Sequence, residues 1–146
     1  MLLPDINALI YAHRSDSPEH QRYSDWLVRL VESPSPFGLS DFVMTGFVRI
    51  VTNRRVFREP TPRTVAVDFL ANLLSQPNCV MVLPSSRQWR LMMELCEQAD
   101  VVGPLVSDAY LAAQAIDHGC ELVTTDSDFA RFQGLRWSHP LAARES

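Results

Sequence analysis

Short apolar runs alternate with longer amphipathic segments along this chain. The runs at residues 2–3, 79–83 and 121–125 are each followed by polar or turn-forming residues, which is typical of short buried strands. The longer segments repeat apolar residues at three- and four-residue spacing, which predicts helices. Because predicted strands alternate with helices, we expect an α/β fold with a central parallel β-sheet flanked by helices.

Several predicted helices carry residues that commonly begin or end a helix. Ser40 is expected to cap a helix that ends near residue 53, and Gly119 is expected to end another helix that begins near residue 107. Other helices are predicted around residues 8–12, 19–31, 62–74 and 89–96. The segment at residues 34–39 is predicted to be a loop.

Length and composition bound the class of protein. The chain has 146 residues, about the size of one compact domain, so residues 1–146 are expected to form a single domain. No run approaches the roughly 20 apolar residues that a membrane-spanning helix needs. The start of the chain also lacks a basic region before its apolar stretch. We therefore expect a cytoplasmic protein without membrane contact.

Cysteine and histidine show no pattern typical of a metal or redox site. Cys79, Cys96 and Cys120 have no C-x-x-C spacing, so neither a disulfide framework nor a zinc site is predicted. The four histidines lie in different predicted elements. His13 follows the first apolar segment closely, but we expect it to be structural as well.

Positive charge is concentrated in one part of the chain although the net charge is −4. All thirteen basic residues are arginine. Between residues 49 and 63, which we call the arginine segment, five arginines face the single acid Glu59; they are Arg49, Arg54, Arg55, Arg58 and Arg63. Guanidinium groups suit phosphate oxygens, so the segment is a candidate nucleic-acid contact. The alternative is a solvated helix end.

Acidic residues follow two of the predicted strands. Asp5 and Asp126 come after apolar runs, Asp128 lies two residues further on, and Asp108 lies at a predicted helix start. Ligands of parallel sheets gather at the carboxyl ends of the strands, so these carboxylates are expected to converge there. Convergence favours a hard cation such as Mg²⁺ or Mn²⁺. Each acid taken singly could instead cap a helix or shape a turn.

Three motifs in this order resemble those of PIN-domain VapC toxins. Residues 5–12, DINALIYA, are similar to the family's D-x-N-[VA]-L-[LI]-Y-A start, and residues 108–113 resemble its D-A-x-[LI]-A-A helix. Residues 124–129, TTDSDF, resemble its closing T-x-D-x-D-F motif. Residues 46–57 are similar to a version common in mycobacterial and other actinobacterial toxins.

The resemblance implies a PIN-like fold and the toxin of a type II toxin–antitoxin pair. Such a toxin is an Mg²⁺- or Mn²⁺-dependent endoribonuclease, with tRNA or rRNA as substrate. By this resemblance Asp5 and Asp108 hold the metal, and Asp126 and Asp128 complete the catalytic set. Arg49, Arg54 and Arg55 are the candidates for RNA contact.

The resemblance also implies a cognate VapB-like antitoxin and a homodimer. Such an antitoxin commonly inserts a peptide with a basic side chain among the active-site carboxylates. We expect Trp26 and Phe47 to be exposed and to contribute to the surface that contacts the antitoxin or a second toxin.

One position departs from the family pattern. Many PIN domains have a glutamate three residues before the arginine of this helix, where this chain has Gly46. Asp41 is the nearest acid, but in an ideal helix it lies about 140° around the axis from Gly46. Either Asp41 approaches from the helix cap or the site uses four aspartates. We expect Asp41 to be a first-turn residue that interacts with the helix dipole.

The same residues can be compared with two other classes of protein. Gly46 is compatible with a non-catalytic PIN-like module that binds RNA or a partner without cleaving. A phosphotransferase or receiver domain is disfavoured, because the chain lacks a D-x-D start, any lysine and the glycine-rich nucleotide fingerprints.

Overall fold

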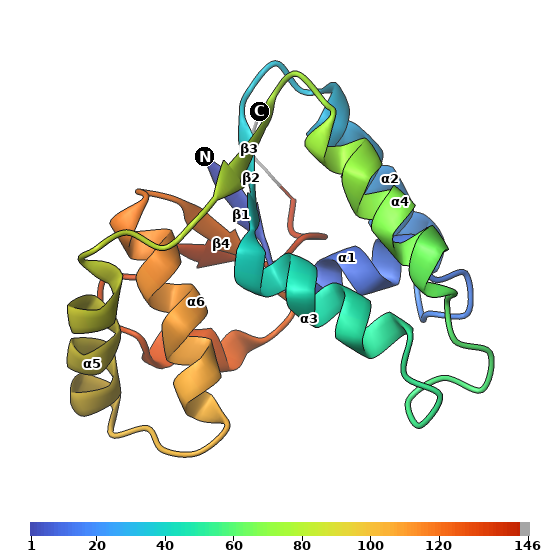
Figure 1. Cartoon of the computed structure of the whole chain (residues 1–146). Helices are drawn as coiled ribbons and strands as arrows, with labels where there is room; N and C mark the ends of the chain where they lie inside the picture. The colour runs from blue at the N-terminus through green and yellow to red at the C-terminus, as the bar shows by residue number, and fades with distance from the viewer. Residues whose placement is uncertain (144–146) are drawn as a thin grey trace.

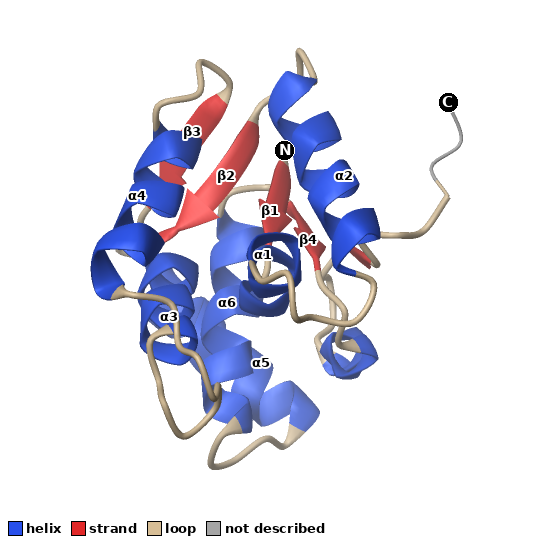
Figure 2. Ribbon diagram, turned by 90° about the vertical axis from the view of Figure 1, so that its right-hand side faces the viewer, coloured by secondary structure: helices blue, strands red, loops and turns tan. Residues whose placement is uncertain are grey.

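Five short strands form one parallel sheet in the order β3-β2-β1-β4-β5 (Figures 1 and 2). The structure is a computed structural model and describes residues 1–143. The strands are β1 (Leu2–Pro4), β2 (Phe37–Ser40), β3 (Cys79–Val82), β4 (Glu121–Val123) and β5 (Trp137–Ser138). All four neighbouring pairs are parallel, as the alternation of strands and helices predicted.

Helices connect the strands and cover both faces of the sheet. They are α1 (Ile6–His13), α2 (His20–Glu32), α3 (Asp41–Val51), α4 (Arg63–Leu74), α5 (Gln88–Ala99) and α6 (Leu105–Asp117), and a 3₁₀ helix spans Ser127–Arg131. In Figure 1, α2 and α4 lie on one side of the sheet and α5 and α6 on the other. The predicted α/β fold with flanking helices is therefore confirmed. Within residues 1–143 no helix is long and apolar enough to cross a membrane.

Two predicted helix ends are confirmed in detail. The Ser40 side chain accepts a hydrogen bond from the backbone N–H of Phe42 at 3.1 Å, and so caps α3. Gly119 follows the last residues of α6 with φ +65°, a conformation that glycine adopts without strain.

The prediction of a loop at residues 34–39 is wrong in its second half, where β2 is an interior strand. Phe37 and Leu39 are fully buried between the neighbouring strands and helices. A Cβ atom on Gly38 would lie 2.8 Å from Val82 Cγ2, so this strand also needs a glycine to pack against β3. Four residues that include a glycine give too little periodicity to identify a strand. The two-residue β5 escaped prediction for the same reason.

The expectation that Trp26 and Phe47 are exposed is wrong. Their relative accessibilities are 5% and 0%. Phe47 stacks on Phe69 of α4 with ring centroids 5.1 Å apart, and His13 packs edge-on against Phe47 at 5.4 Å. Helices α2 and α3 turn these large side chains inward, so the two residues belong to the hydrophobic core. The expected structural role of His13 is confirmed.

Helices α1 and α3 approach closely at Gly46. A Cβ atom at this position would lie 2.4 Å from Ile6 Cδ1 and 3.2 Å from Ile6 Cγ1. Gly46 is itself buried. The side chain of Ile6 therefore occupies the space that a glutamate at position 46 would need.

We predict that Gly46→Glu destabilises the fold because it forces Ile6 out of its position. The free energy of unfolding in urea should fall by about 1–3 kcal/mol, the usual cost of overpacking. Combining it with Ile6→Ala should cost less than the sum of the two single changes, because the alanine removes the clashing atoms. The exposed neighbour Thr45 provides the control, since Thr45→Glu adds the same side chain to the same helix. Additive losses would contradict the clash.

Candidate active site

Asp5 lies at the junction of the two central strands. It directly follows β1 and is the N-cap of α1, and its backbone N–H donates to the carbonyl of Val123 on β4 at 2.9 Å. Its carboxylate accepts one hydrogen bond from the N–H of Ile6 and one from Thr124 Oγ1, both at 2.7 Å. The residue is only 8% exposed. Burial raises the pKa of Asp5, and the hydrogen bonds oppose that rise.

Thr124 connects Asp5 to the acids that follow β4. Its hydroxyl donates to Asp5 and accepts the backbone N–H of Asp126 at 3.0 Å. Asp126 in turn accepts the N–H of Asp128 at 2.8 Å and so caps the 3₁₀ helix. Thr124 is fully buried, whereas Asp128 is exposed. The T-x-D-x-D pattern thus folds as a turn that brings Asp126 back toward Asp5.

Asp108 reaches the same place from the first turn of α6. Partial burial is the largest cause that raises the pKa of its carboxyl, followed by the negative charges of Asp126 and Asp5. The negative charge of Asp126 also raises the pKa of Asp5. Three segments far apart in the sequence therefore bring carboxylates within electrostatic reach of one another.

Arg131 places a positive charge beside this group. Its Nε donates to the backbone carbonyl of Asp128 at 2.9 Å, and its guanidinium lies 3.8 Å from the Asp128 carboxylate. The charge of Arg131 lowers the pKa of Asp108, in opposition to the acids. We refer to Asp5, Asp108, Asp126 and Asp128 as the acid cluster.

The acid cluster is compatible with a cation that keeps most of its water. Within residues 1–143 no three histidine, cysteine or acidic side chains are close enough to hold a metal ion by themselves. Mg²⁺ does not need such a cage, because it is usually bound by one or two carboxylates together with waters and substrate phosphates. The donors are all oxygens, and their mutual repulsion favours a cation between them. These residues therefore fit Mg²⁺ or Mn²⁺ better than zinc.

Asp41 is hydrogen-bonded to two residues of α6. It lies in the first turn of α3, as expected, and accepts hydrogen bonds from Gln114 Nε2 at 3.0 Å and from the Tyr110 hydroxyl at 3.4 Å. Its carboxylate lines a pocket of about 280 Å³ beside Gly46 and ties α3 to α6.

The arginine segment is exposed along most of its length. Arg49 lies on α3 and lines the same pocket as Asp41. Arg54 and Arg55 follow in the turn after α3, where the Asn53 side chain accepts the N–H of Arg55 at 2.9 Å. These guanidinium groups point to solvent and are accessible to a ligand.

We predict that Asp108→Asn stabilises the metal-free protein at neutral pH. Because the pKa of Asp108 is raised in the folded state, its ionisation costs stability above the pKa of the unfolded chain. A neutral asparagine removes that cost, so the thermal midpoint in EDTA should rise by a few degrees at pH 7. The gain should shrink as the pH is lowered toward about 4, where unfolded-state aspartates become protonated.

The control for this comparison is Asp68→Asn on the exposed face of α4. It should change the thermal midpoint little at either pH. An Asp108→Asn protein that is less stable than wild type at pH 7 would show that Asp108 is not destabilised by its neighbours.

The chain is similar to known proteins over nearly its whole length. The PIN domain family matches residues 2–135. Ribonuclease VapC43 of Mycobacterium tuberculosis is 43% identical over 141 residues, which cover 97% of this chain and 96% of VapC43. Ribonuclease VapC31 of the same organism is 41% identical over 140 residues, covering 96% of this chain and 99% of VapC31.

A solved structure shares the fold. The crystal structure of VapBC2 from Rickettsia felis, bound to a DNA fragment from their promoter, contains a chain that matches with a TM-score of 0.69. The match covers 94% of this chain and 97% of that chain at 20% identity. Together with the identity to VapC43 and VapC31, these matches show that the chain belongs to the PIN-domain family and, within it, to the VapC ribonucleases.

Proposed function

We propose that this VapC ribonuclease is a divalent-metal-dependent endoribonuclease and the toxin of a type II toxin–antitoxin pair. The observation that carries the proposal is the convergence of Asp5, Asp108 and Asp126 from three segments, at a cost in electrostatic free energy. A fold that needed these residues only as caps would not have to hold their charges together. The naming of VapC43 and VapC31 as ribonucleases supports RNA as the substrate.

Asp5 and Asp108 are the residues that would hold Mg²⁺ or Mn²⁺. A metal bound there lowers the pKa of a water and stabilises negative charge on the phosphate. The hydrogen bonds from Ile6 and Thr124 orient the Asp5 carboxylate. Asp126 and the exposed Asp128 complete the site and would orient the attacking water or a second ion. Their outward position in the turn leaves them accessible to substrate.

Arg49, Arg54 and Arg55 bind the RNA backbone in this proposal. An acid cluster repels phosphates, so a polyanion needs positive contacts elsewhere on the protein. The exposed guanidinium groups of the arginine segment supply them, and contacts to phosphate position the RNA without reading its sequence. The substrate class is tRNA or rRNA, which places the site of action in the cytoplasm.

A VapB-like antitoxin is the proposed partner, and a homodimer is the proposed assembly. A basic side chain inserted into the acid cluster would form charge-assisted hydrogen bonds with several carboxylates at once. It would offset the burial and the repulsion between carboxylates that together raise the pKa of Asp108. Inhibition would then compete directly with metal binding.

We predict that purified protein cleaves RNA only with Mg²⁺ or Mn²⁺ and that EDTA abolishes cleavage. The readout is the cleavage of a panel of purified tRNAs and rRNA, resolved on sequencing gels. Asp5→Asn should lower the rate of RNA cleavage at least about 100-fold. Asparagine keeps the shape of the side chain but removes its negative charge, so the site binds the metal poorly. Binding of RNA without any cleavage would favour the non-catalytic module. Activity with zinc alone would contradict the oxygen-ligand site.

We predict that expression of this chain alone arrests bacterial growth. Co-expression of the reading frame beside its gene should restore growth, and Asp108→Asn should be harmless without it. Equal protein levels must be verified by immunoblot. Arrest by Asp108→Asn to the same extent as by wild type would show that toxicity does not come from the acid cluster.

A further inference from the structure

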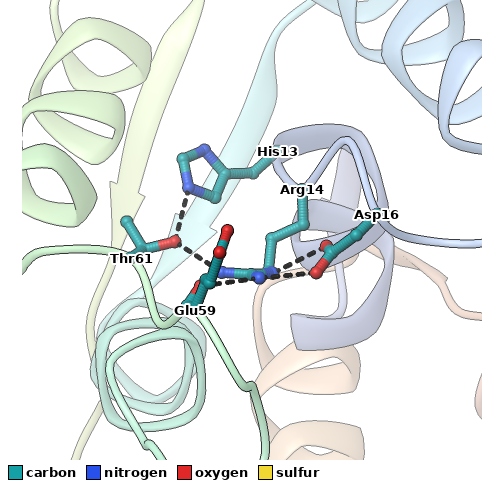
Figure 3. Close-up of polar contacts among 5 residues, drawn as sticks. All are labelled: His13, Arg14, Asp16, Glu59 and Thr61. Carbon is teal, nitrogen blue, oxygen red and sulfur yellow. Dashed lines mark hydrogen bonds and ion pairs between the residues drawn. The ribbon is translucent and has the colours of Figure 1, made fainter.

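Arg14 is a buried arginine at the C-terminal end of α1, and it is only 8% exposed. Its Nε and Nη2 atoms donate to the two carboxylate oxygens of Asp16 at 2.9 and 2.6 Å (Figure 3). Nη2 also donates to the carbonyl of Glu59 at 2.9 Å, and Nη1 donates to Thr61 Oγ1 at 3.1 Å. The guanidinium carbon lies 3.8 Å from the centre of the Phe57 ring.

These contacts join α1 to the connection between α3 and α4. We call Arg14, Asp16, Phe57, Glu59 and Thr61 the Arg14 cluster, and residues 52–60 the arginine loop. The loop carries three exposed arginines, Arg54, Arg55 and Arg58. The residues that flank the two ends of the loop are joined directly, because Thr61 donates its backbone N–H to the carbonyl of Val51 at 2.8 Å. The loop is therefore closed at its base and attached to α1 near its end.

Loop closure alone does not explain a buried arginine. Desolvating a guanidinium is costly, and a hydrophobic side chain packed on Phe57 could hold the loop at lower cost. An arginine fork, however, engages several partners in one plane and so sets the direction as well as the position of the segment. Asp16 is exposed, and its hydrogen bond with Arg14 lowers its pKa.

Helix α1 connects this cluster to the acid cluster. Asp5 is the N-cap of α1 and Arg14 is its C-cap. Eight helical residues span about 12 Å at 1.5 Å per residue. The arginine loop is thus attached to one end of a short rigid helix whose other end carries the most buried carboxylate of the acid cluster.

We propose that Arg14 is a positioning residue for RNA: it holds the arginine loop in a fixed place relative to the acid cluster, so that Arg54 and Arg55 bind backbone phosphates away from the scissile bond. The proposal rests on the proposed ribonuclease function. It adds that efficient cleavage needs an RNA long enough to reach both ends of α1. A short oligonucleotide that occupies only the acid cluster gains nothing from the loop.

The decisive measurement is a double-mutant cycle on RNA binding in EDTA, where no cleavage occurs. Arg14→Lys keeps the charge but loses the fork. We expect it to weaken binding of a full-length tRNA on the order of tenfold and to reduce the salt slope by about 1 or more, as the loss of a phosphate contact does. Added to Arg54→Ala/Arg55→Ala it should cause little further loss, because the groups it positions are already gone.

Further variants separate positioning from general destabilisation. Asp16→Asn weakens the cluster from its exposed side and should give a smaller loss of the same kind. Arg22→Lys replaces an exposed, ion-paired arginine on α2 and should bind RNA like wild type. Thermal midpoints identify any variant that is not folded. For cleavage of the long RNA, Arg14→Lys should raise KM and leave kcat nearly unchanged, and cleavage of a short oligonucleotide should be unaffected.

The outcomes separate this proposal from the proposed function. The role of Arg14 would be overturned if the losses in RNA-binding free energy from Arg14→Lys and from Arg54→Ala/Arg55→Ala added fully. It would also be overturned if Arg14→Lys and Asp16→Asn both bound RNA like wild type. A wild-type protein that binds RNA but never cleaves it would contradict the ribonuclease proposal and the cleavage part of the Arg14 proposal, while the binding cycle would still decide whether Arg14 positions the arginine loop for RNA. A wild-type protein that does not bind RNA would overturn both.

Discussion

The hydrogen bond from Thr124 to Asp5 is the contact on which the acid cluster depends. Residues Leu2–Pro4 of β1 pair in parallel with Glu121–Val123 of β4, so both strands end at the same edge of the sheet. The Thr124 hydroxyl joins the residue after one strand to the turn after the other. Without it a carboxylate as buried as that of Asp5 would lose a main compensation for its desolvation. The two central strands and the acid cluster are thus stabilised by the same few atoms.

That the acids would converge at one place in the fold was predictable, because the carboxyl ends of parallel strands meet at one edge of the sheet. Asp5 and Asp126 could be placed from short apolar runs, and Asp108 from a helix start. The α/β class followed from the same pattern. Strand β2 was not predictable from periodicity, because it is four residues long and has a glycine between two buried residues. Trp26 and Phe47 lie on the apolar faces of α2 and α3, so the periodicity that predicts these helices also favours burial of both side chains.

The Arg14 cluster was missed for a related reason. Arg14 is one of thirteen arginines, and nothing in its sequence neighbourhood distinguishes it from the exposed ones. Its partners Glu59 and Thr61 lie 45 and 47 residues away. Gly46 carried a clearer signal, because an expected acid was absent. The structure gives the physical reason: the Ile6 side chain fills the space beside Gly46 that a glutamate would need. Ile6 is also the residue whose backbone N–H donates to the Asp5 carboxylate.

The net charge of −4 and an RNA substrate are reconciled by where the charges lie. Asp5 is kept from solvent at the start of α1, while the arginines of the loop are exposed beyond its end. A polyanion approaching from solvent meets the exposed guanidinium groups, and exposed charges contribute most to the potential at the surface. The acid cluster repels the same phosphates, and in the proposed function a cation bound there offsets that repulsion. In the proposed function, the acid cluster at the start of α1 and the exposed arginines of the loop held at its other end therefore divide two tasks, metal binding and RNA binding, within a protein of negative net charge.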